Sequence, residues 1–358
     1  MASGSRTSLG FGIVGVGMIA DYHARAVLDA AGARLVGVCG RSEEKTRAFA
    51  AKHNIGFSTT DLQALLAHPE LDVLCIATPS GAHLEPAIAA ARAGKHIVIE
   101  KPLEVTLPRV DALLHEARTA GVKLMPIFQA RFGAGARTLK AALTAGRFGR
   151  LVLASAYVKW HRTAAYYQDS WHGTQSLDGG GALINQAIHG LDLLQWFAGL
   201  PSEVFSWNTR RVHTGIEVED TAVASLRYPD GTLGAIEAST ALYPGWARRI
   251  EICGENGSAV LEDDSLVRWD FRESRPEDAA IHAARPDPMM KSGASAPNQI
   301  SHHGHLRQIE NLVACIQNGT PLEVDGPEAR KAVALILALY KSASTGAVVS
   351  VSSAPTTP

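Results

Sequence analysis

Two glycines near the start of the chain have the spacing of a phosphate-binding turn. Gly15 and Gly17 follow a short apolar run, and Ala20 stands three residues further on. In this G-x-G-x-x-A pattern the first glycine makes a tight turn, the second lets a pyrophosphate approach the backbone, and the small third residue lets a helix pack on the strand. Met18 and Ile19 open that helix, whose free N–H groups attract an anion. We therefore expect a dinucleotide site here; the alternative is a tight strand-to-helix turn without a ligand.

The end of the next predicted strand bears on which dinucleotide binds. A carboxylate there hydrogen-bonds the ribose 2′-hydroxyl of NAD, whereas a nearby arginine suits the 2′-phosphate of NADP. The sequence has Gly40, Arg41 and Ser42 at this position and no carboxylate at the strand end. This pattern favours NADP over NAD. The alternative is that Arg41 stacks on the adenine and Ser42 only caps the following helix, which is compatible with NAD.

A parallel sheet must position these residues, and the first 128 residues predict one. Short β-branched runs alternate with alanine-rich amphipathic stretches, which is typical of βαβ units in a doubly wound Rossmann sheet. Strands are expected at 9–14, 33–39, 73–77, 96–99 and 123–127, and helices at 18–31, 42–53, 60–67, 84–93 and 107–120.

From residue 151 onward, strand-like runs follow one another, which predicts an α+β domain with a mostly antiparallel, open sheet. Turn signals at 229–231 and 255–257 indicate hairpins. Strands are expected at 151–158, 203–212, 218–227, 232–240, 248–253 and 258–262, helices at 182–198, 306–317 and 327–345, and a long loop at 270–301. The predicted organisation is a flexible leader (1–8), a dinucleotide-binding domain (9–128), a substrate-binding and oligomerisation domain (129–351) and a frayed tail (352–358).

The composition excludes several classes of function. The 34 Lys and Arg nearly cancel the 35 Asp and Glu, so no basic excess points to nucleic acid or to a membrane surface. No apolar run approaches the roughly 18 residues of a membrane span, and no signal-peptide core is present at the start. Four widely spaced cysteines without a Cys-x-x-Cys motif are typical of reduced thiols. We expect a cytoplasmic protein.

Two further motifs follow predicted strands at the edge where such sheets bind ligands. Glu100–Lys101–Pro102 closes the strand at 96–99. The strand at 73–77 is followed by Thr78, Pro79, Ser80 and His83. With the opening glycines, in this order and spacing, the chain resembles the glucose-fructose oxidoreductase, inositol dehydrogenase and rhizopine catabolism (Gfo/Idh/MocA) family over residues 9 to 351. The resemblance implies an NAD(P)-dependent oxidoreductase that acts on CH–OH groups.

The second signature of this family is a glycine run leading into a helix that carries an acid or amide and then a histidine. Here the run 179–181 precedes Asn185 and His189, which are one turn apart on one helix face and can both point at one substrate atom. Many members have Asp at the first position, so Asn185 removes a carboxylate and leaves His189 as the sole general base. The branch with nucleotide-sugar 3-dehydrogenases is the most similar, on Asn185 and the upstream Trp160, Arg162, Tyr166, Tyr167 and Trp171.

The resemblance implies reversible hydride transfer between nicotinamide and a secondary hydroxyl or ketone of a sugar or polyol. His189 is then the general acid and base, because imidazole titrates near working pH, with Asn185 as a catalytic neighbour. Lys101 stabilises the alkoxide or polarises the carbonyl. Glu100 faces away from the Lys101 side chain, which favours a structural role. The alternatives are a satisfied buried histidine at 189 and a surface lysine at 101.

Further contacts are expected from residues that combine charge with aromatic faces, as carbohydrate sites do. Besides the residues of the glycine turn and of the two strand ends, cofactor contacts are expected from Glu100, Lys101, Gln129 and Trp171. Substrate contacts are expected from Lys101, Arg131, Lys159, Arg162, Tyr167, His172, Asn185, His189 and His305. Arg162 or Lys159 suits a phosphate or carboxylate. The alternative is that the aromatic residues belong to the core of the second domain.

The histidine cluster 302–305 has no carboxylate or cysteine at ligand spacing, so no metal is expected. His305, at a helix start, is instead expected to face the substrate cleft. Two other functions on the same fold stay open: a glycosidase that oxidises transiently and eliminates with retained NAD, and a non-catalytic nicotinamide-binding sensor, against which Lys101 and His189 argue. By resemblance, the open face of the antiparallel sheet pairs subunits into a homodimer or homotetramer.

Overall fold

The computed structural model describes residues 8–168, 170–284, 293–294 and 301–352. The predicted leader and tail therefore lie almost wholly outside the described residues. The chain divides into two compact units. Unit 1 comprises residues 1–104, 108–129 and 302–328, and unit 2 comprises residues 105–107, 130–301 and 329–358.

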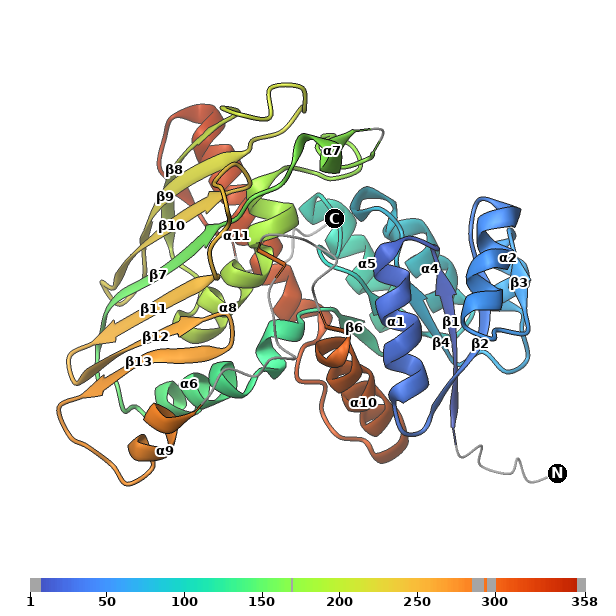
Figure 1. Cartoon of the computed structure of the whole chain (residues 1–358), viewed down its shortest axis with the longest axis horizontal. Helices are drawn as coiled ribbons and strands as arrows, with labels where there is room; N and C mark the ends of the chain where they lie inside the picture. Colours follow the sequence, from blue (N-terminus) through green and yellow to red (C-terminus); the bar gives the residue numbers. More distant parts are fainter. Residues whose placement is uncertain (1–7, 169, 285–292, 295–300, 353–358) are drawn as a thin grey trace. The chain divides into compact units, whose positions relative to one another are not determined.

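Unit 1 is built on a six-stranded parallel sheet, which confirms the Rossmann prediction (Figure 1). In spatial order its strands are β3 (Ser58–Thr59), β2 (Ala33–Cys39), β1 (Leu9–Val14), β4 (Val73–Ile76), β5 (His96–Ile99) and β6 (Leu124–Pro126). The connecting helices are α1 (Met18–Asp29), α2 (Glu43–Lys52), α3 (Leu62–Leu66), α4 (Leu84–Arg92) and α5 (Leu107–Thr119), with the 3-10 turn η1 (Ser80–Ala82) after β4. All four residues of β4 are buried, as expected for a strand covered on both faces.

A late helix, α10 (His303–Asn318), also belongs to unit 1. Its apolar stripe of Ile309, Leu312 and Val313 joins the core formed by β1, β4 and α1. Unit 1 therefore extends beyond the predicted range 9–128, because the chain returns to it before residues 329–358 complete unit 2.

Unit 2 is built on an eight-stranded sheet in which only β7 and β10 pair in parallel, in agreement with the mostly antiparallel prediction. Its spatial order is β13 (Ser265–Phe271), β12 (Gly257–Glu262), β11 (Arg249–Gly254), β7 (Leu151–Lys159), β10 (Leu233–Ser239), β9 (Thr221–Arg227), β8 (Glu203–Thr209) and β14 (Val349–Ser350). The helices are α6 (Ala134–Thr144), α7 (Ala164–Tyr167), α8 (Ile188–Ala198), α9 (Asp278–Ala283) and α11 (Gly326–Thr345), together with the turns η2 (Gln129–Phe132) and η3 (Ala182–Ala187).

Two parts of unit 2 differ from the sequence prediction. The expected helix at 182–198 begins with a π-helical turn, η3, and only continues as the α-helix α8. The expected loop at 270–301 contains α9, because Asp278 at the start of that helix is held by the guanidinium of Arg147 at 2.6 Å and by the indole N–H of Trp269 at 2.7 Å. Much of the remaining stretch lies outside the described residues.

Within the part of the chain that the structure describes, no helix is both long enough and apolar enough to cross a bilayer.

Candidate functional site

The glycine turn has the geometry that its sequence predicts. Gly15 has a φ of +102°, and a Cβ on it would lie 2.4 Å from the carbonyl oxygen of Ala77, so no larger residue fits. At Gly17, by contrast, nothing lies within 4 Å of the position that a Cβ would occupy. Gly17 precedes α1, which has no side-chain cap on its first N–H groups. An uncapped helix start beside open space fits the phosphates of a dinucleotide.

The helix that follows β2 is capped by a side chain, whereas α1 is not. A Cβ on Gly40 would lie 2.5 Å from the hydroxyl of Thr46, which requires a glycine there. Ser42 caps α2, because its Oγ accepts the N–H of Lys45 at 3.4 Å. The side chain of Arg41 is exposed. Ser42 thus has the capping role of the NAD-compatible alternative, and Arg41 is the residue at this strand end that suits a 2′-phosphate.

The residues after β4 form a loop that is braced from inside. The hydroxyl of Thr78 donates to the carbonyl of Ala82 at 2.9 Å. His83 is buried, with Nδ1 2.9 Å from the carbonyl oxygen of Pro102 and Nε2 3.0 Å from that of Thr78. Burial lowers the pKa of His83. His83 therefore joins the loop after β4 to the turn after β5, and we interpret it as a support of the cofactor loop.

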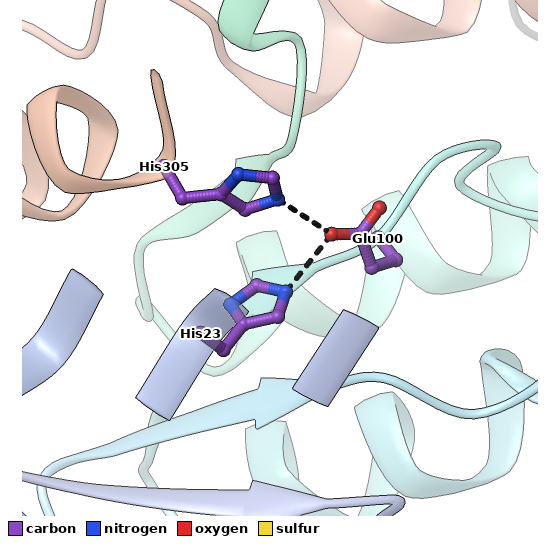
Figure 2. A group of neighbouring side chains, drawn as sticks. All are labelled: His23, Glu100 and His305. Atoms are coloured by element: carbon purple, nitrogen blue, oxygen red, sulfur yellow. Dashed lines mark hydrogen bonds and ion pairs between the residues drawn. The ribbon is translucent and has the colours of Figure 1, made fainter. Parts of the chain in front are cut away.

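Glu100 lies at the centre of a buried cluster in unit 1 (Figure 2). Its Oε1 is 2.9 Å from Nε2 of His23 on α1 and 3.0 Å from Nε2 of His305 on α10, while Oε2 accepts the backbone N–H of Lys101 at 3.2 Å. Burial alone would raise the pKa of Glu100, but the hydrogen bonds from His23 and His305 bring it well below its usual range. Burial also lowers the pKa of His23. The cluster thus holds an ionised Glu100 beside a neutral His23, which agrees with the structural role expected for Glu100.

The same cluster places His305 in the interior of unit 1, although the sequence suggested a substrate-facing position. The ligand atoms of His23, Glu100 and His305 lie within 4.8 Å of one another, and two imidazoles with a carboxylate are donors that zinc accepts. The His–Glu distances are those of charge-assisted hydrogen bonds, which satisfy the carboxylate without an ion. The spacing of residues around 302–305 did not predict this cluster, because Glu100 and His23 are far from His305 in sequence and meet it only in the folded structure.

Lys101 and Gln129 lie at the edge of unit 1 where the parallel strands end. Lys101 follows β5, which is separated from the glycine turn of β1 only by β4. The carboxamide oxygen of Gln129 is buried and has no hydrogen-bond partner among the described residues. A Cβ on Gly304 would lie 2.7 Å from the Cβ of Gln129, so α10 approaches closely at this point. A buried acceptor without a partner fits a ligand donor at this edge.

In unit 2, the glycine run before Asn185 is required by close packing. A Cβ on Gly180 would lie 2.0 Å from the hydroxyl of Tyr340. The carboxylate of Glu219 accepts the N–H groups of Gly181 and Leu183 and the hydroxyl of Tyr340, each at 2.9 Å. Burial raises the pKa of Glu219, and these bonds offset part of that effect. Glu219 and Tyr340 thus fix the start of η3, the turn that carries Asn185.

Asn185 lies in a network that the sequence prediction missed. Its Nδ2 donates to Oδ1 of Asp178 and lies 3.3 Å from Nδ1 of His172, while its Oδ1 accepts Nε2 of Gln186 at 2.8 Å. His189 is buried further along, on α8. A carboxylate therefore does stand beside residue 185, but it comes from Asp178 at the start of the glycine run. The sequence feature that could have predicted this carboxylate is the aspartate directly before the glycine run.

Two of the predicted substrate-binding cations of unit 2, Arg131 and Lys159, form ion pairs within the unit. Arg131 forms a buried bidentate pair with Asp192, with Nε–Oδ2 and Nη2–Oδ1 distances of 2.7 and 2.6 Å. The ammonium of Lys159 is 2.6 Å from the carboxylate of Glu237. We interpret Arg131 as a residue that holds the start of unit 2 to α8, while Lys159 is partly exposed.

Arg162 and the nearby aromatic residues form a second group. Arg162 is buried and donates to Oε1 of Gln186 at 2.6 Å and to two main-chain carbonyls, and burial lowers its pKa. The ring of His172 lies 4.4 Å from that of Tyr166 and 3.9 Å from that of Trp171. The hydroxyl of Tyr167 donates to Thr240, and burial raises the pKa of Tyr167 to about 12. Arg162 is thus an internal donor, whereas the aromatic residues of this group, Tyr166, Tyr167, Trp171 and His172, all keep partial exposure.

Comparison with known proteins assigns this chain to a family. Residues 9–128 match the oxidoreductase family with the NAD-binding Rossmann fold, and residues 136–260 match the GFO/IDH/MocA C-terminal domain. The chain belongs to the Gfo/Idh/MocA family, as its motifs indicated. It is an NAD-binding oxidoreductase of the sugar and polyol dehydrogenase type.

Several relatives are similar over most of their length. The WlbA dehydrogenase of Bordetella pertussis, solved with NADH and UDP-GlcNAcA, is 31% identical with a TM-score of 0.86, covering 96% of this chain and 97% of that one. The 1,5-anhydro-D-fructose reductase of Ensifer adhaerens is 28% identical over 70% of this chain and 74% of its own. The myo-inositol 2-dehydrogenase of Thermotoga maritima is 26% identical over 92% and 95%.

Proposed function

We propose that this protein interconverts a secondary hydroxyl and a ketone on a sugar, polyol or sugar derivative. The observation that carries the proposal is the carboxyl edge of the unit 1 sheet, where an open glycine turn after β1 and Lys101 after β5 flank β4. Bound NAD(P) would supply the hydride donor or acceptor at this edge. A cation beside a dinucleotide site suits an oxygen that gains negative charge during the reaction.

Two side chains of the protein then act on the hydroxyl proton and on the negative charge that develops on the substrate oxygen. Lys101 stabilises the developing alkoxide, and the bond from its N–H to Glu100 restrains its backbone. His189 takes the hydroxyl proton during oxidation and returns it during reduction, which suits an imidazole. Asn185, held by Asp178 and Gln186, has its carboxamide oriented before substrate binds.

For the cofactor, we propose a preference for NADP that depends on Arg41. Its exposed guanidinium follows a strand end that has no carboxylate to bind a 2′-hydroxyl. The expected result is a higher kcat/KM with NADP than with NAD, and Arg41→Ala should reduce the NADP value selectively. Equal losses with both cofactors would assign Arg41 to adenine stacking instead.

For the substrate, the similarity to WlbA favours a nucleotide-linked sugar within the wider carbohydrate class. The test is a panel of UDP-sugars, free sugars and inositols with each cofactor, followed by nicotinamide absorbance. Lys101→Met and His189→Ala should each lower kcat by roughly 100-fold or more. Lys123→Met is the matched control, because Lys123 is exposed and precedes β6 at the opposite edge of the same sheet.

Each outcome of this test separates the candidate functions. Near-normal activity in both variants would overturn the roles given to Lys101 and His189. Glycoside cleavage without net reduction of added cofactor would identify the glycosidase. Cofactor binding without turnover of any substrate would favour the sensor.

We also propose that two copies of the chain pair through the eight-stranded sheet. Trp207 and Val223 lie directly opposite each other on β8 and β9, as do Leu153 and Leu233 on β7 and β10, and all four are 46–63% exposed. Such apolar cross-strand pairs on one face are typical of a surface that is covered by a partner. Light scattering should give at least a dimer, and Trp207→Ser with Val223→Ser should shift it toward monomer.

A further inference from the structure

A line of hydrogen bonds in unit 2 runs in one direction from a buried cation to a buried carboxylate. Arg162 donates to Oε1 of Gln186 at 2.6 Å, Nε2 of Gln186 donates to Oδ1 of Asn185 at 2.8 Å, and Nδ2 of Asn185 donates to Asp178. All four residues are at most 8% exposed. A guanidinium only donates and an ionised carboxylate only accepts, so the two ends determine how both amides are oriented.

This orientation has a consequence for His172. Nδ2 of Asn185 carries two hydrogens, and with one of them bound to Asp178 the other is available to Nδ1 of His172, 3.3 Å away. Asp178 itself is 3.8 Å from that nitrogen, too far for a hydrogen bond. Nδ1 therefore acts as an acceptor. A neutral imidazole whose Nδ1 accepts carries its proton on Nε2.

The surroundings of His172 hold the ring in place while leaving it accessible. The ring stacks on that of Tyr166 with an interplanar angle of 14°, and it also contacts the ring of Trp171, the preceding residue. Its side chain is 22% exposed. Nε2 is on the opposite side of the ring from the Asn185 amide, and it has no hydrogen-bond partner within the described part of the chain. His172 thus offers an oriented N–H donor.

We propose that His172 binds the substrate through Nε2–H, and that Asp178 is a positioning residue that selects this tautomer through Asn185. The substrate role rests on the proposed function. The partner of Nε2–H is an acceptor oxygen of the carbohydrate, either a hydroxyl or a carbonyl. The pairing also accounts for the amide at position 185: a second carboxylate there would face Asp178 and Nδ1 of His172, and it would move the imidazole proton to Nδ1.

The decisive variant exchanges the two side chains, Asp178→Asn with Asn185→Asp. The exchange keeps one carboxylate, one amide and the bond from Gln186, so a purely structural role is preserved. It places a carboxylate opposite Nδ1 of His172, so the proton must move from Nε2 to Nδ1. Glu217→Gln is the matched control, because this exposed carboxylate accepts the N–H of Gln175 in the same loop without contacting the line of bonds.

Nitrogen-15 NMR of the histidine rings reads the tautomer directly and needs neither cofactor nor substrate. The signal of His172 is assigned by its loss in His172→Gln. We expect Nε2–H in the wild type and in Glu217→Gln, and Nδ1–H in the exchanged variant. Nδ1–H in the wild type would overturn the proposal, even if the exchanged variant failed to fold. An unchanged tautomer in the exchanged variant would overturn it as well.

Kinetics then test the substrate role. Loss of one donor should raise the KM of the exchanged variant about tenfold, with a smaller change in kcat. Wild-type KM together with a changed tautomer would overturn the assignment of His172 to substrate binding. Failure to find any substrate would count against the proposed function and would leave the NMR result in force.

Discussion

His305 and Glu100 are separated by 205 residues in sequence, and Nε2 of His305 lies 3.0 Å from Oε1 of Glu100. This contact ties the first turn of α10 to the carboxylate that also accepts the N–H of Lys101. With His23 on α1 as the third member, one buried carboxylate connects the helix of the glycine turn, the end of β5 and a helix from the far end of the chain.

Replacing the carboxylate should affect both stability and turnover. In Glu100→Gln one of the two acceptor oxygens is replaced by an NH₂ group. That donor then faces another donor, either the N–H of a histidine or the backbone N–H of Lys101. We expect a loss of about 2 kcal/mol in the free energy of unfolding and a fall in kcat that exceeds any change in cofactor KM. Urea unfolding and steady-state kinetics measure the two effects. The control is His302→Gln, whose contact to Asp29 is exposed; an equal loss there would contradict the role of the cluster.

The same cluster predicts sensitivity to acid. The pKa of Glu100 is lowered in the folded protein, so its stabilising contribution is complete above the unfolded value of about 4.3 and is lost as pH falls. The pKa of His23 is lowered too, so below about 6.5 the unfolded chain binds a proton that the folded protein excludes. Urea unfolding of the wild type should therefore show stability that decreases from pH 7 to pH 3. The stability gap to Glu100→Gln should narrow below about pH 4.3, where the contribution of Glu100 is lost, and a gap that stays constant down to pH 3 would refute the prediction.

The two glycines of the turn should respond in opposite ways. Gly15→Ala places a Cβ 2.4 Å from the carbonyl of Ala77 at a φ of +102°, so it should be destabilised by about 1–3 kcal/mol. Gly17→Ala meets no protein atom and should fold normally, while the methyl group obstructs the phosphates. Thermal unfolding and NADH fluorescence titration separate the two effects. Normal cofactor affinity in Gly17→Ala would show that the phosphates do not approach this glycine.

The pair of Arg131 and Asp192 should be a structural element. Arg131→Met removes the guanidinium from the buried carboxylate of Asp192, which keeps the longer bond from Nε2 of Gln195, and should cost about 3–5 kcal/mol of stability. The double variant Arg131→Met with Asp192→Leu should recover most of that loss, because the buried carboxylate is removed together with its guanidinium. If the double variant regains stability but has a raised substrate KM, Arg131 binds substrate as its position in the sequence suggested.

Local patterns were sufficient to predict most of the fold. The turn at Gly15 and Gly17 and the alternation of strands and helices depend on neighbours in sequence, and these features agree with the structure. The membership of α10 in unit 1 depends on the packing of Ile309 and Leu312 against β1 and α1, nearly 300 residues earlier. The hydrophobic periodicity of a helix shows which of its faces is buried, but it does not show which distant segment covers that face.

The candidate site was predictable in its residue types but not in its pairings. Arg131 and Arg162 look like available cations in the sequence, and only the fold brings Asp192 and Gln186 to them. The departure at Asn185 suggested a missing carboxylate, whereas Asp178 supplies one from seven residues upstream. A charge and its partner that lie on different elements cannot be matched by spacing alone.

The π-helical turn at Ala182–Ala187 makes the exact number of residues between the glycine run and α8 important. A π-turn contains one more residue than the α-helical turn that it replaces, so deletion of a single residue there would let the helix run on as an ordinary α-helix. Each residue in an α-helix corresponds to a rotation of about 100°, so the deletion would swing Asn185 around the helix axis relative to His189. A variant with every functional side chain intact would then have them on different faces, which makes residue count in this segment a determinant of activity.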